Sequence, residues 1–273
     1  MMAQIIDRKR LKADTKDLLS TAQVSPKTMA ALYLGLILVL NLLDTAAGGT
    51  AEALTDRNLL GIFVYVLASL VSTILSAGFV LYCMTIRRNE RAEFLTLFDG
   101  FTLVGKLIGL QIVTNLFIAL WAMLFVIPGI IAAYRYRFAL YNLLEDPDTG
   151  ILEALEMSKR QTNGYKSQLF LLDMSYLGWE LLASLPVIPY SWQFSMTMLS
   201  GSVVGPQLPA LVWTLAIGLW SLAVSLFYLP NYQCVELAYF EIAKSTSGVG
   251  FDVPPRQPNS TSGQTGPDGL GGL

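Results

Sequence analysis

Residues 103–144 read LVGKLIGLQIVTNLFIALWAMLFVIPGIIAAYRYRFALYNLL. The apolar run from Leu107 to Ala133 is longer than the ~20 helical residues that cross a hydrocarbon core ~30 Å thick. Ile127-Pro128-Gly129 interrupts this run, and proline removes a helix donor while glycine permits a sharp turn. The number of membrane spans in the chain depends on whether this tripeptide kinks one span or joins two spans as a hairpin.

Further apolar runs surround this stretch, at residues 32–43, 59–84, 169–186 and 211–229. The chain has 273 residues, of which 53% are hydrophobic and 14% are charged. Soluble domains carry roughly 25% charged residues, so this composition is typical of a protein embedded in lipid. The sequence therefore predicts an all-α, polytopic integral membrane protein.

The distribution of basic residues favours the hairpin. Arg135, Arg137, Lys159, Arg160 and Lys166 are close together in the sequence, whereas residues 191–209 contain no Lys or Arg. A single kinked span would place the basic segment outside and the uncharged segment inside, against the positive-inside rule. A hairpin returns every basic segment to the cytoplasm. We therefore expect about six spans, near residues 28–47, 59–85, 103–126, 130–144, 168–189 and 211–229, with the five-span chain as the alternative.

This arrangement predicts a multi-pass protein of the plasma membrane with both termini in the cytoplasm. The N-terminal segment, residues 1–27, combines six basic residues with a thin apolar face of Leu11, Leu18 and Leu19. Such a helix is expected to lie on anionic lipids, and the same charges also act as a topology signal. The basic residues are Arg8, Lys9, Arg10, Lys12, Lys16 and Lys27.

Two other segments are expected outside the spans. Glu145-Asp146-Pro147-Asp148 is typical of a helix start, and Asn163-Gly164 is typical of a helix end. Between them we predict a cytoplasmic helix that lies at the membrane interface. Residues 245–273 are rich in Gly, Pro, Ser and Thr and are predicted to be disordered.

The composition argues against most catalytic chemistry. The chain contains no histidine, which excludes a Ser-His-Asp triad and any histidine-based zinc site. Cys83 and Cys234 lie far apart in the sequence and are expected to be apolar packing residues. The net charge of −2 gives no basic field for nucleic acid. We therefore expect a non-enzymatic protein without a cofactor or metal.

Ionisable residues at membrane depth are the strongest pointers to a functional site, because each is costly unless it is paired. Asp173 and Glu180 are seven residues apart, on one face of the predicted fifth span, and could pair with Arg135 or Arg137 in the fourth. The pairs would either line a polar pathway or fix helix packing, and the packing role is the commoner one. Gln111 and Asn115, one turn apart in the third span, are open to the same two interpretations.

Several motifs together resemble the signature of an uncharacterised bacterial integral-membrane family, domain-of-unknown-function family 975. They are Phe98-Asp99-Gly100-Phe101, Ile127-Pro128-Gly129-Ile130, Tyr134-Arg135-Tyr136, the series Glu153-Ala154-Leu155, Ser158-Lys159, Gly164, Lys166, Leu169-Phe170, Leu172, Ser175, Gly178-Trp179, and finally Leu229-Pro230, Ala238 and Phe240-Glu241. The resemblance extends to about Lys244, and it departs from the family pattern where Asn231 separates Pro230 from Tyr232. It implies a helical membrane protein of a Gram-positive bacterium and no particular activity.

Three classes of function remain at this stage. The first is a non-catalytic scaffold or accessory protein of the envelope, which would bind other membrane proteins. The second is a transporter or channel-like protein for a small solute or peptide, which would need a polar path past Glu180, Arg135, Gln111 and Asn115. A lipid-acting enzyme ranks last, because no nucleophile motif or metal cluster is present. The oligomeric state is left open.

Overall fold

The computed structural model describes residues 5–22, 24–48, 58–188 and 208–250, which form helices and connecting turns and contain no strand. In chain order the elements are α1 (Arg8–Ser20), α2 (Pro26–Ala46), α4 (Leu59–Arg87), the 3-10 helix η1 (Phe94–Leu103), α5 (Val104–Leu124), α6 (Val126–Arg135), α7 (Ala139–Glu145), α8 (Ile151–Gln161), α9 (Lys166–Met174), α10 (Leu177–Ser184) and α12 (Leu208–Ser247). The predicted disordered tail, residues 245–273, overlaps α12, which continues to Ser247. The rest of that tail from residue 251 onward and nearly all of the predicted outer segment 191–209 lie outside the described residues.

Four helical stretches are long and apolar enough to cross a membrane: residues 26–46, 59–87, 94–124 and 210–247. The first, second, third and sixth predicted spans fall on these stretches. The chain is thus an all-helical protein with several helices of membrane-spanning length and hydropathy.

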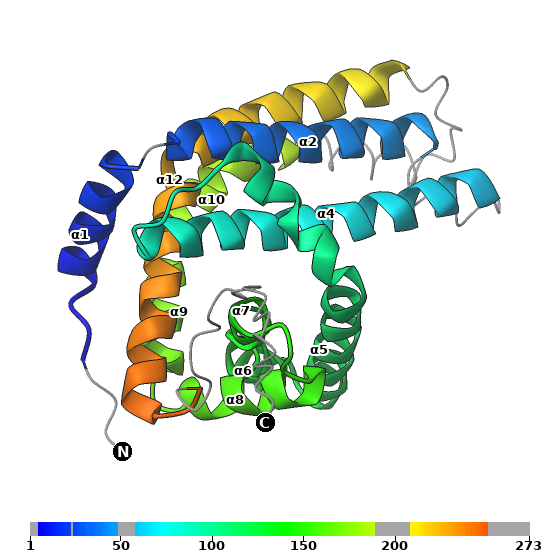
Figure 1. Cartoon of the computed structure of the whole chain (residues 1–273). Helices are drawn as coiled ribbons and strands as arrows, with labels where there is room; N and C mark the ends of the chain where they lie inside the picture. The colour runs from blue at the N-terminus through cyan, green and yellow to red at the C-terminus, as the bar shows by residue number, and fades with distance from the viewer. Residues whose placement is uncertain (1–4, 23, 49–57, 189–207, 251–273) are drawn as a thin grey trace, which may run out of the picture.

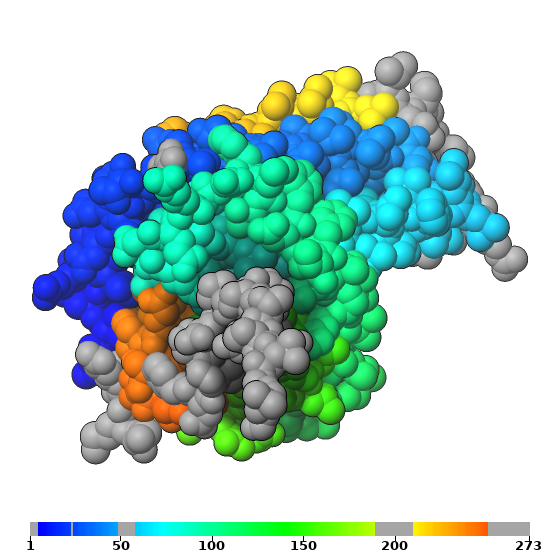
Figure 2. Space-filling model, viewed as in Figure 1, coloured from blue at the N-terminus to red at the C-terminus, as the bar shows by residue number. Residues whose placement is uncertain are grey.

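Three of these helices lie side by side and form an arm. α2, the first half of α4 and the first half of α12 extend together beyond the rest of the molecule (Figures 1 and 2). Gly218 of α12 lets α2 approach, since a Cβ there would lie 2.1 Å from Leu38 Cδ1. Large apolar side chains such as Phe63, Leu43 and Leu219 are exposed on the arm. An apolar surface of this extent is suited to lipid rather than to water.

The second half of α4 packs against η1 through glycines. A Cβ on Gly78 would lie 1.8 Å from the carbonyl oxygen of Leu97, and a Cβ on Gly100 would lie 2.5 Å from the carbonyl oxygen of Ile74. The two backbones are therefore in direct contact, which only glycine allows at these positions.

α12 bends where Pro230 interrupts its hydrogen-bond ladder. The helix has 40 residues with Pro230 inside it, and proline can neither donate to residue 226 nor fit a straight helix. Its first half runs along the arm, and its second half turns away beside α1 and α9 (Figure 1). The prediction that the chain stays helical from Pro230 to Lys244 is confirmed.

The second half of α12 helps to enclose a compact core with α7 and α8. The ring of Phe240 lies 5.5 Å from the rings of both Phe138 and Tyr141. Asn142 and Gln161 exchange side-chain hydrogen bonds of 2.9 and 2.8 Å inside this core. Buried amides that satisfy each other in this way fix α8 against α7.

The fourth and fifth predicted spans are not single helices. In place of one helix over residues 130–144, α6 ends at Arg135 and α7 begins at Ala139. In place of one helix over residues 168–189, α9 ends at Met174 and α10 begins at Leu177. A hydropathy pattern does not reveal such breaks, because the polar contacts that stabilise them come from elsewhere in the chain.

The chain does reverse near Ile127-Pro128-Gly129, but the turn is at Phe125. Phe125 is extended, with φ −159° and ψ 151°, between the end of α5 and the start of α6. A Cβ on Gly129 would lie 2.8 Å from the Cβ of Ala122, so α6 folds back against α5. The helix is thus interrupted at Phe125 and is not continuous through Ile131.

Both predicted surface helices are present, and each packs on the protein. α8 begins at Ile151, later than the predicted start at residues 145–148, and Leu155 points into the core. Its predicted end is confirmed by Gly164, which has φ +89°. Helix α1 places Leu11 and Leu18 against the core, so its apolar face is covered by protein.

Candidate functional site

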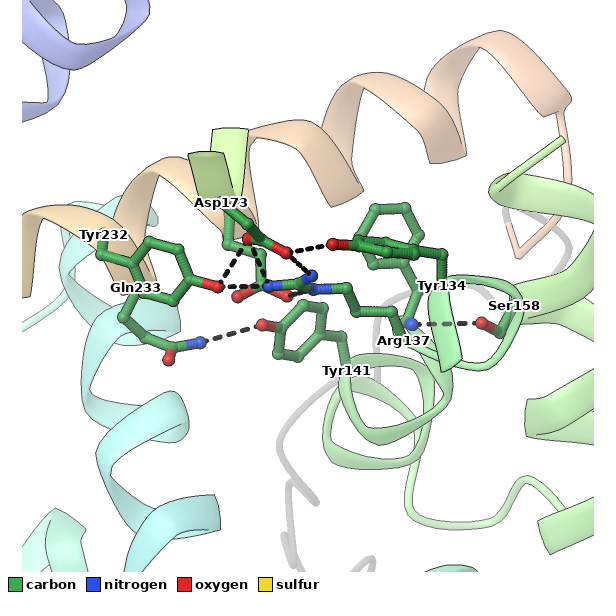
Figure 3. Close-up of polar contacts among 9 residues, drawn as sticks. Tyr134, Arg137, Tyr141, Ser158, Asp173, Tyr232 and Gln233 are labelled. Carbon is green, nitrogen blue, oxygen red and sulfur yellow. Dashed lines mark hydrogen bonds and ion pairs between the residues drawn. The ribbon is translucent and has the colours of Figure 1, made fainter. Parts of the chain in front are cut away.

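Arg137 lies in the break between α6 and α7 and is the centre of the largest polar cluster among the described residues (Figure 3). Its Nη1 and Nη2 donate to the two carboxylate oxygens of Asp173, at 2.6 and 3.0 Å. Its Nε donates to Glu236 Oε1 at 2.5 Å. One guanidinium thus joins α9 and the second half of α12 to the α6–α7 connection.

Two tyrosines complete this arrangement. Tyr134 OH donates to Asp173 Oδ2 at 2.6 Å, and Tyr232 OH donates to Asp173 Oδ1 at 2.9 Å. Arg137 Nη2 also donates to the hydroxyl of Tyr232. We call Tyr134, Arg137, Asp173, Tyr232 and Glu236 the Arg137 cluster.

The Arg137 cluster is enclosed and internally paired. The side chain of Glu236 is 6% exposed, and those of Arg137 and Asp173 are 19% and 21% exposed. Two carboxylates face one guanidinium, so the cluster has a formal charge of −1, which the tyrosine hydroxyls stabilise by donating to Asp173. Removal of one partner from such a site leaves a charge without compensation and is costly.

The elements bring these residues together at helix discontinuities. Asp173 is the penultimate residue of α9. Tyr232 and Glu236 lie one helical turn from each other in α12, directly after the bend at Pro230. Arg137 and Asp173 were predicted from the sequence as site residues. Tyr134 was not, and neither were Tyr232 and Glu236. The only sequence signal for the latter two was an acidic residue one helical turn after a tyrosine, directly beyond a proline.

A cavity of about 410 Å³ lies beside Arg137, between α4, α5 and the α6–α7 connection. Gln111 on α5 and Arg137 in the α6–α7 connection both line it. Gln111 Nε2 also donates to Asn115 Oδ1 at 3.3 Å. The remaining side chains with a polar atom on its wall are Ser72, Thr73, Ser76, Thr114 and Tyr136.

Glu180 and Arg135 are not part of the Arg137 cluster. Glu180 is exposed on α10 and forms no ion pair within the described residues. The guanidinium of Arg135 lies 5.9 Å from the ring of Trp121. The six residues selected from the sequence therefore divide into the Arg137–Asp173 pair, the Gln111–Asn115 pair and two residues that stand apart.

A second set of ion pairs joins the ends of three helices. Arg87 on α4 pairs with Glu241 on α12 at 2.5 Å. Glu145, the last residue of α7, pairs with Arg88 at 3.3 Å and with Lys244 at 2.7 Å. Throughout residues 5–22, 24–48, 58–188 and 208–250, no three Cys, Asp or Glu side chains gather in a way that could hold a metal ion.

Comparison with known proteins gives one result. The model of the family described as "Protein of unknown function (DUF975)" matches residues 122–246, which include every member of the Arg137 cluster. The resemblance noted from the motifs is thus confirmed over this part of the chain, and the match does not extend to Phe98–Phe101. No curated protein and no solved structure matches the chain.

Proposed function

We propose, from the resemblance of residues 122–246 to a family of unknown function and from the Arg137 cluster, that this chain is a non-catalytic scaffold or accessory protein of a bacterial plasma membrane. The observation that carries the proposal is that the charged groups of the cluster bind one another. They tie together helices that are interrupted, which is a structural use of buried charge. A catalytic group would instead have to face a substrate.

The proposed topology has six crossings and both termini in the cytoplasm. The broken elements α6–α7 and α9–α10 would form the short fourth and fifth crossings. The tip of the α5–α6 hairpin supports an entry into lipid, since Met123, Phe125 and Ile127 are 85%, 70% and 71% exposed. The basic N-terminal segment would then face the anionic cytoplasmic leaflet.

Single-cysteine labelling from outside tests this topology, in a protein whose Cys83 and Cys234 are replaced. The probes are placed on the exposed residues Asn163 and Ile127, and on Gly201 in the predicted outer segment. We expect labelling at Ile127→Cys and Gly201→Cys but not at Asn163→Cys. Labelling at Asn163→Cys without labelling at Gly201→Cys would exclude the six-span arrangement. If Ile127→Cys reacts neither from outside nor, in opened membranes, from inside, the hairpin enters the membrane without crossing it.

A growth assay tests the scaffold role in a strain that lacks the gene and is sensitive to envelope stress. We expect Gln111→Leu with Thr114→Val, which makes the cavity apolar, to restore growth as the wild-type protein does. Lys159→Gln with Arg160→Gln, which removes charge from an exposed end of α8, should fail, because partners would dock on the basic cytoplasmic segments. The opposite pattern would exclude the scaffold.

The alternative is a transporter or channel for a small solute or peptide, and the 410 Å³ cavity is the observation that favours it. A cysteine at Ser72 or Thr114 would then react with a small water-soluble thiol reagent in intact membranes. Gln111→Leu would also reduce solute flux in liposomes. If neither site is reactive, the cavity is closed to water and serves packing alone.

A further inference from the structure

A groove of about 960 Å³ lies apart from the 410 Å³ cavity, with which it shares no lining residue, and outside the Arg137 cluster. Its walls come from α1, the start of α2, the junction of α9 and α10, and α12 around Pro230. These segments are far apart in the sequence, and the bend of α12 lets α1 lie alongside its second half (Figure 1). The groove is thus a product of the tertiary structure.

One wall of the groove is basic. Lys12, Lys16 and Lys27 line it, and no Asp or Glu is among its described lining residues. Within the part of the chain that the structure describes, neither Lys16 nor Lys27 forms an ion pair with a carboxylate. A groove of this size therefore presents three ammonium groups without a built-in counter-charge.

Lys12 is the most constrained of the three lysines. Its Nζ donates to Ser175 Oγ at 2.7 Å and lies 3.7 Å from the centre of the Tyr176 ring. Burial, together with the neighbouring charge of Arg8, lowers the pKa of Lys12 below its ordinary value. An anion in the groove would relieve this cost, because an opposite charge nearby favours the protonated form.

The facing wall is aromatic, and its rings are exposed at the surface of the protein. Trp179 and Phe227 line the groove and are 42% and 69% exposed. Trp179 stacks on Tyr228 with ring centres 6.2 Å apart, and Lys27 Nζ lies 5.7 Å from the ring of Phe227. An exposed Trp ring beside a partly buried Tyr ring and lysines is typical of the level at which lipid headgroups meet acyl chains.

We propose that this groove binds one anionic phospholipid. The phosphate lies among Lys12, Lys16 and Lys27, and the acyl chains leave along Phe227 and Trp179 into the bilayer. The charge of the lysine wall selects an anion, and the exposed rings select an amphiphile over a soluble anion. The inference rests on the proposed function in one respect, namely that the first turn of α2 lies at the cytoplasmic surface.

The test is native mass spectrometry of the full chain in a neutral detergent, with phosphatidylglycerol or phosphatidylcholine added. We expect the wild-type protein to retain one phosphatidylglycerol and to prefer it over phosphatidylcholine. Lys12→Gln with Lys16→Gln should weaken this binding by about tenfold or more. The matched control is Lys9→Gln with Arg10→Gln, which removes the same charge from exposed positions of α1 outside the groove and should change binding by less than about twofold.

Two further measurements separate a lipid site from loss of folding and from binding of a soluble anion. Lys16→Gln alone leaves the Lys12 contacts intact, so its weaker binding should appear at an unchanged melting temperature. Glycerophosphoglycerol, which has the headgroup without acyl chains, should not compete. If the groove variant and the control variant weaken phosphatidylglycerol binding equally, the binding is diffuse attraction to the charged surface and not a site in the groove. If glycerophosphoglycerol competes as well as phosphatidylglycerol does, the groove binds a soluble anion and not a lipid. If discrete binding is absent while Asn163→Cys is shielded from outside, only the lipid site fails and the topology stands.

Discussion

Asp173 accepts two hydrogen bonds from Arg137, at 2.6 and 3.0 Å, across 36 positions of sequence. The two residues lie where two predicted spans are broken, one just beyond α6 and the other at the end of α9. Helix ends leave backbone groups without helical partners, which is unfavourable in lipid unless other groups replace them. The ion pair therefore links the interruption between α6 and α7 to the interruption between α9 and α10.

Arg137 should be the most sensitive member of its cluster. Arg137→Gln leaves Asp173 and Glu236 close together without a cation, and we expect it to lower the free energy of unfolding by about 3–5 kcal/mol. Asp173→Asn leaves one guanidinium with one carboxylate, so the cluster becomes neutral and the loss should be about 1–2 kcal/mol. Denaturant titration of the purified protein, followed by tryptophan fluorescence, measures both variants.

The control for this comparison is Glu180→Gln. Glu180 is an acidic residue of the same region, but it is exposed. Its substitution should change the free energy of unfolding by less than about 0.5 kcal/mol. An equal loss for Arg137→Gln and Asp173→Asn would contradict the charge balance assigned to the cluster.

Gly78 and Gly35 should respond oppositely to the same substitution. Gly78→Ala would press a Cβ to within 1.8 Å of the Leu97 carbonyl oxygen and force α4 and η1 apart. Gly35→Ala, in the interior of α2, meets nothing within 4 Å and should stabilise the helix by about 0.5–1 kcal/mol. Thermal melting in detergent distinguishes them, and a raised melting temperature for Gly78→Ala would refute the close packing of α4 on η1.

The buried amide pair of Asn142 and Gln161 offers a double-mutant cycle. Asn142→Leu leaves the Gln161 amide buried without its partner, which should cost about 1–3 kcal/mol. Asn142→Leu with Gln161→Leu removes both polar groups and should recover part of that loss. Unfolding free energies of the two single variants and the double variant measure the coupling, and simple additivity would show that the hydrogen bonds contribute little.

Cys83 and Cys234 should be inert in the folded protein. Both side chains are free thiols and 0% exposed, one on α4 and the other on α12. A maleimide reagent should modify neither thiol in detergent-solubilised native protein and both after unfolding in sodium dodecyl sulfate. Asn163→Cys, at an exposed position, is the positive control. Rapid labelling of the native thiols would mean that the packing of α4 on α12 opens readily.

The long apolar helices could be predicted from the sequence, whereas the broken helices could not, and the difference has a physical reason. The helices at 26–46, 59–87 and 210–247 were predictable, because a long apolar run must satisfy its backbone hydrogen bonds within itself in lipid. Residues 130–144 and 168–189 are less apolar, since each contains two charged residues, and each is broken. The position of each break could not be predicted, because the contacts made there reach Tyr232 and Glu236, 59–99 positions away.

The amino-acid sequence alone was enough to predict an all-helical chain with several helices of membrane-spanning length, because hydropathy is summed along neighbouring positions. It also identified Arg137 and Asp173, since charged residues within apolar runs stand out. The folded structure was needed to show that the helix is interrupted at Phe125, that α12 bends at Pro230, and that Lys12 and Trp179 line one groove. These features arise from contacts between residues distant in sequence, and the energy of such a contact depends on both segments and cannot be predicted from either one alone.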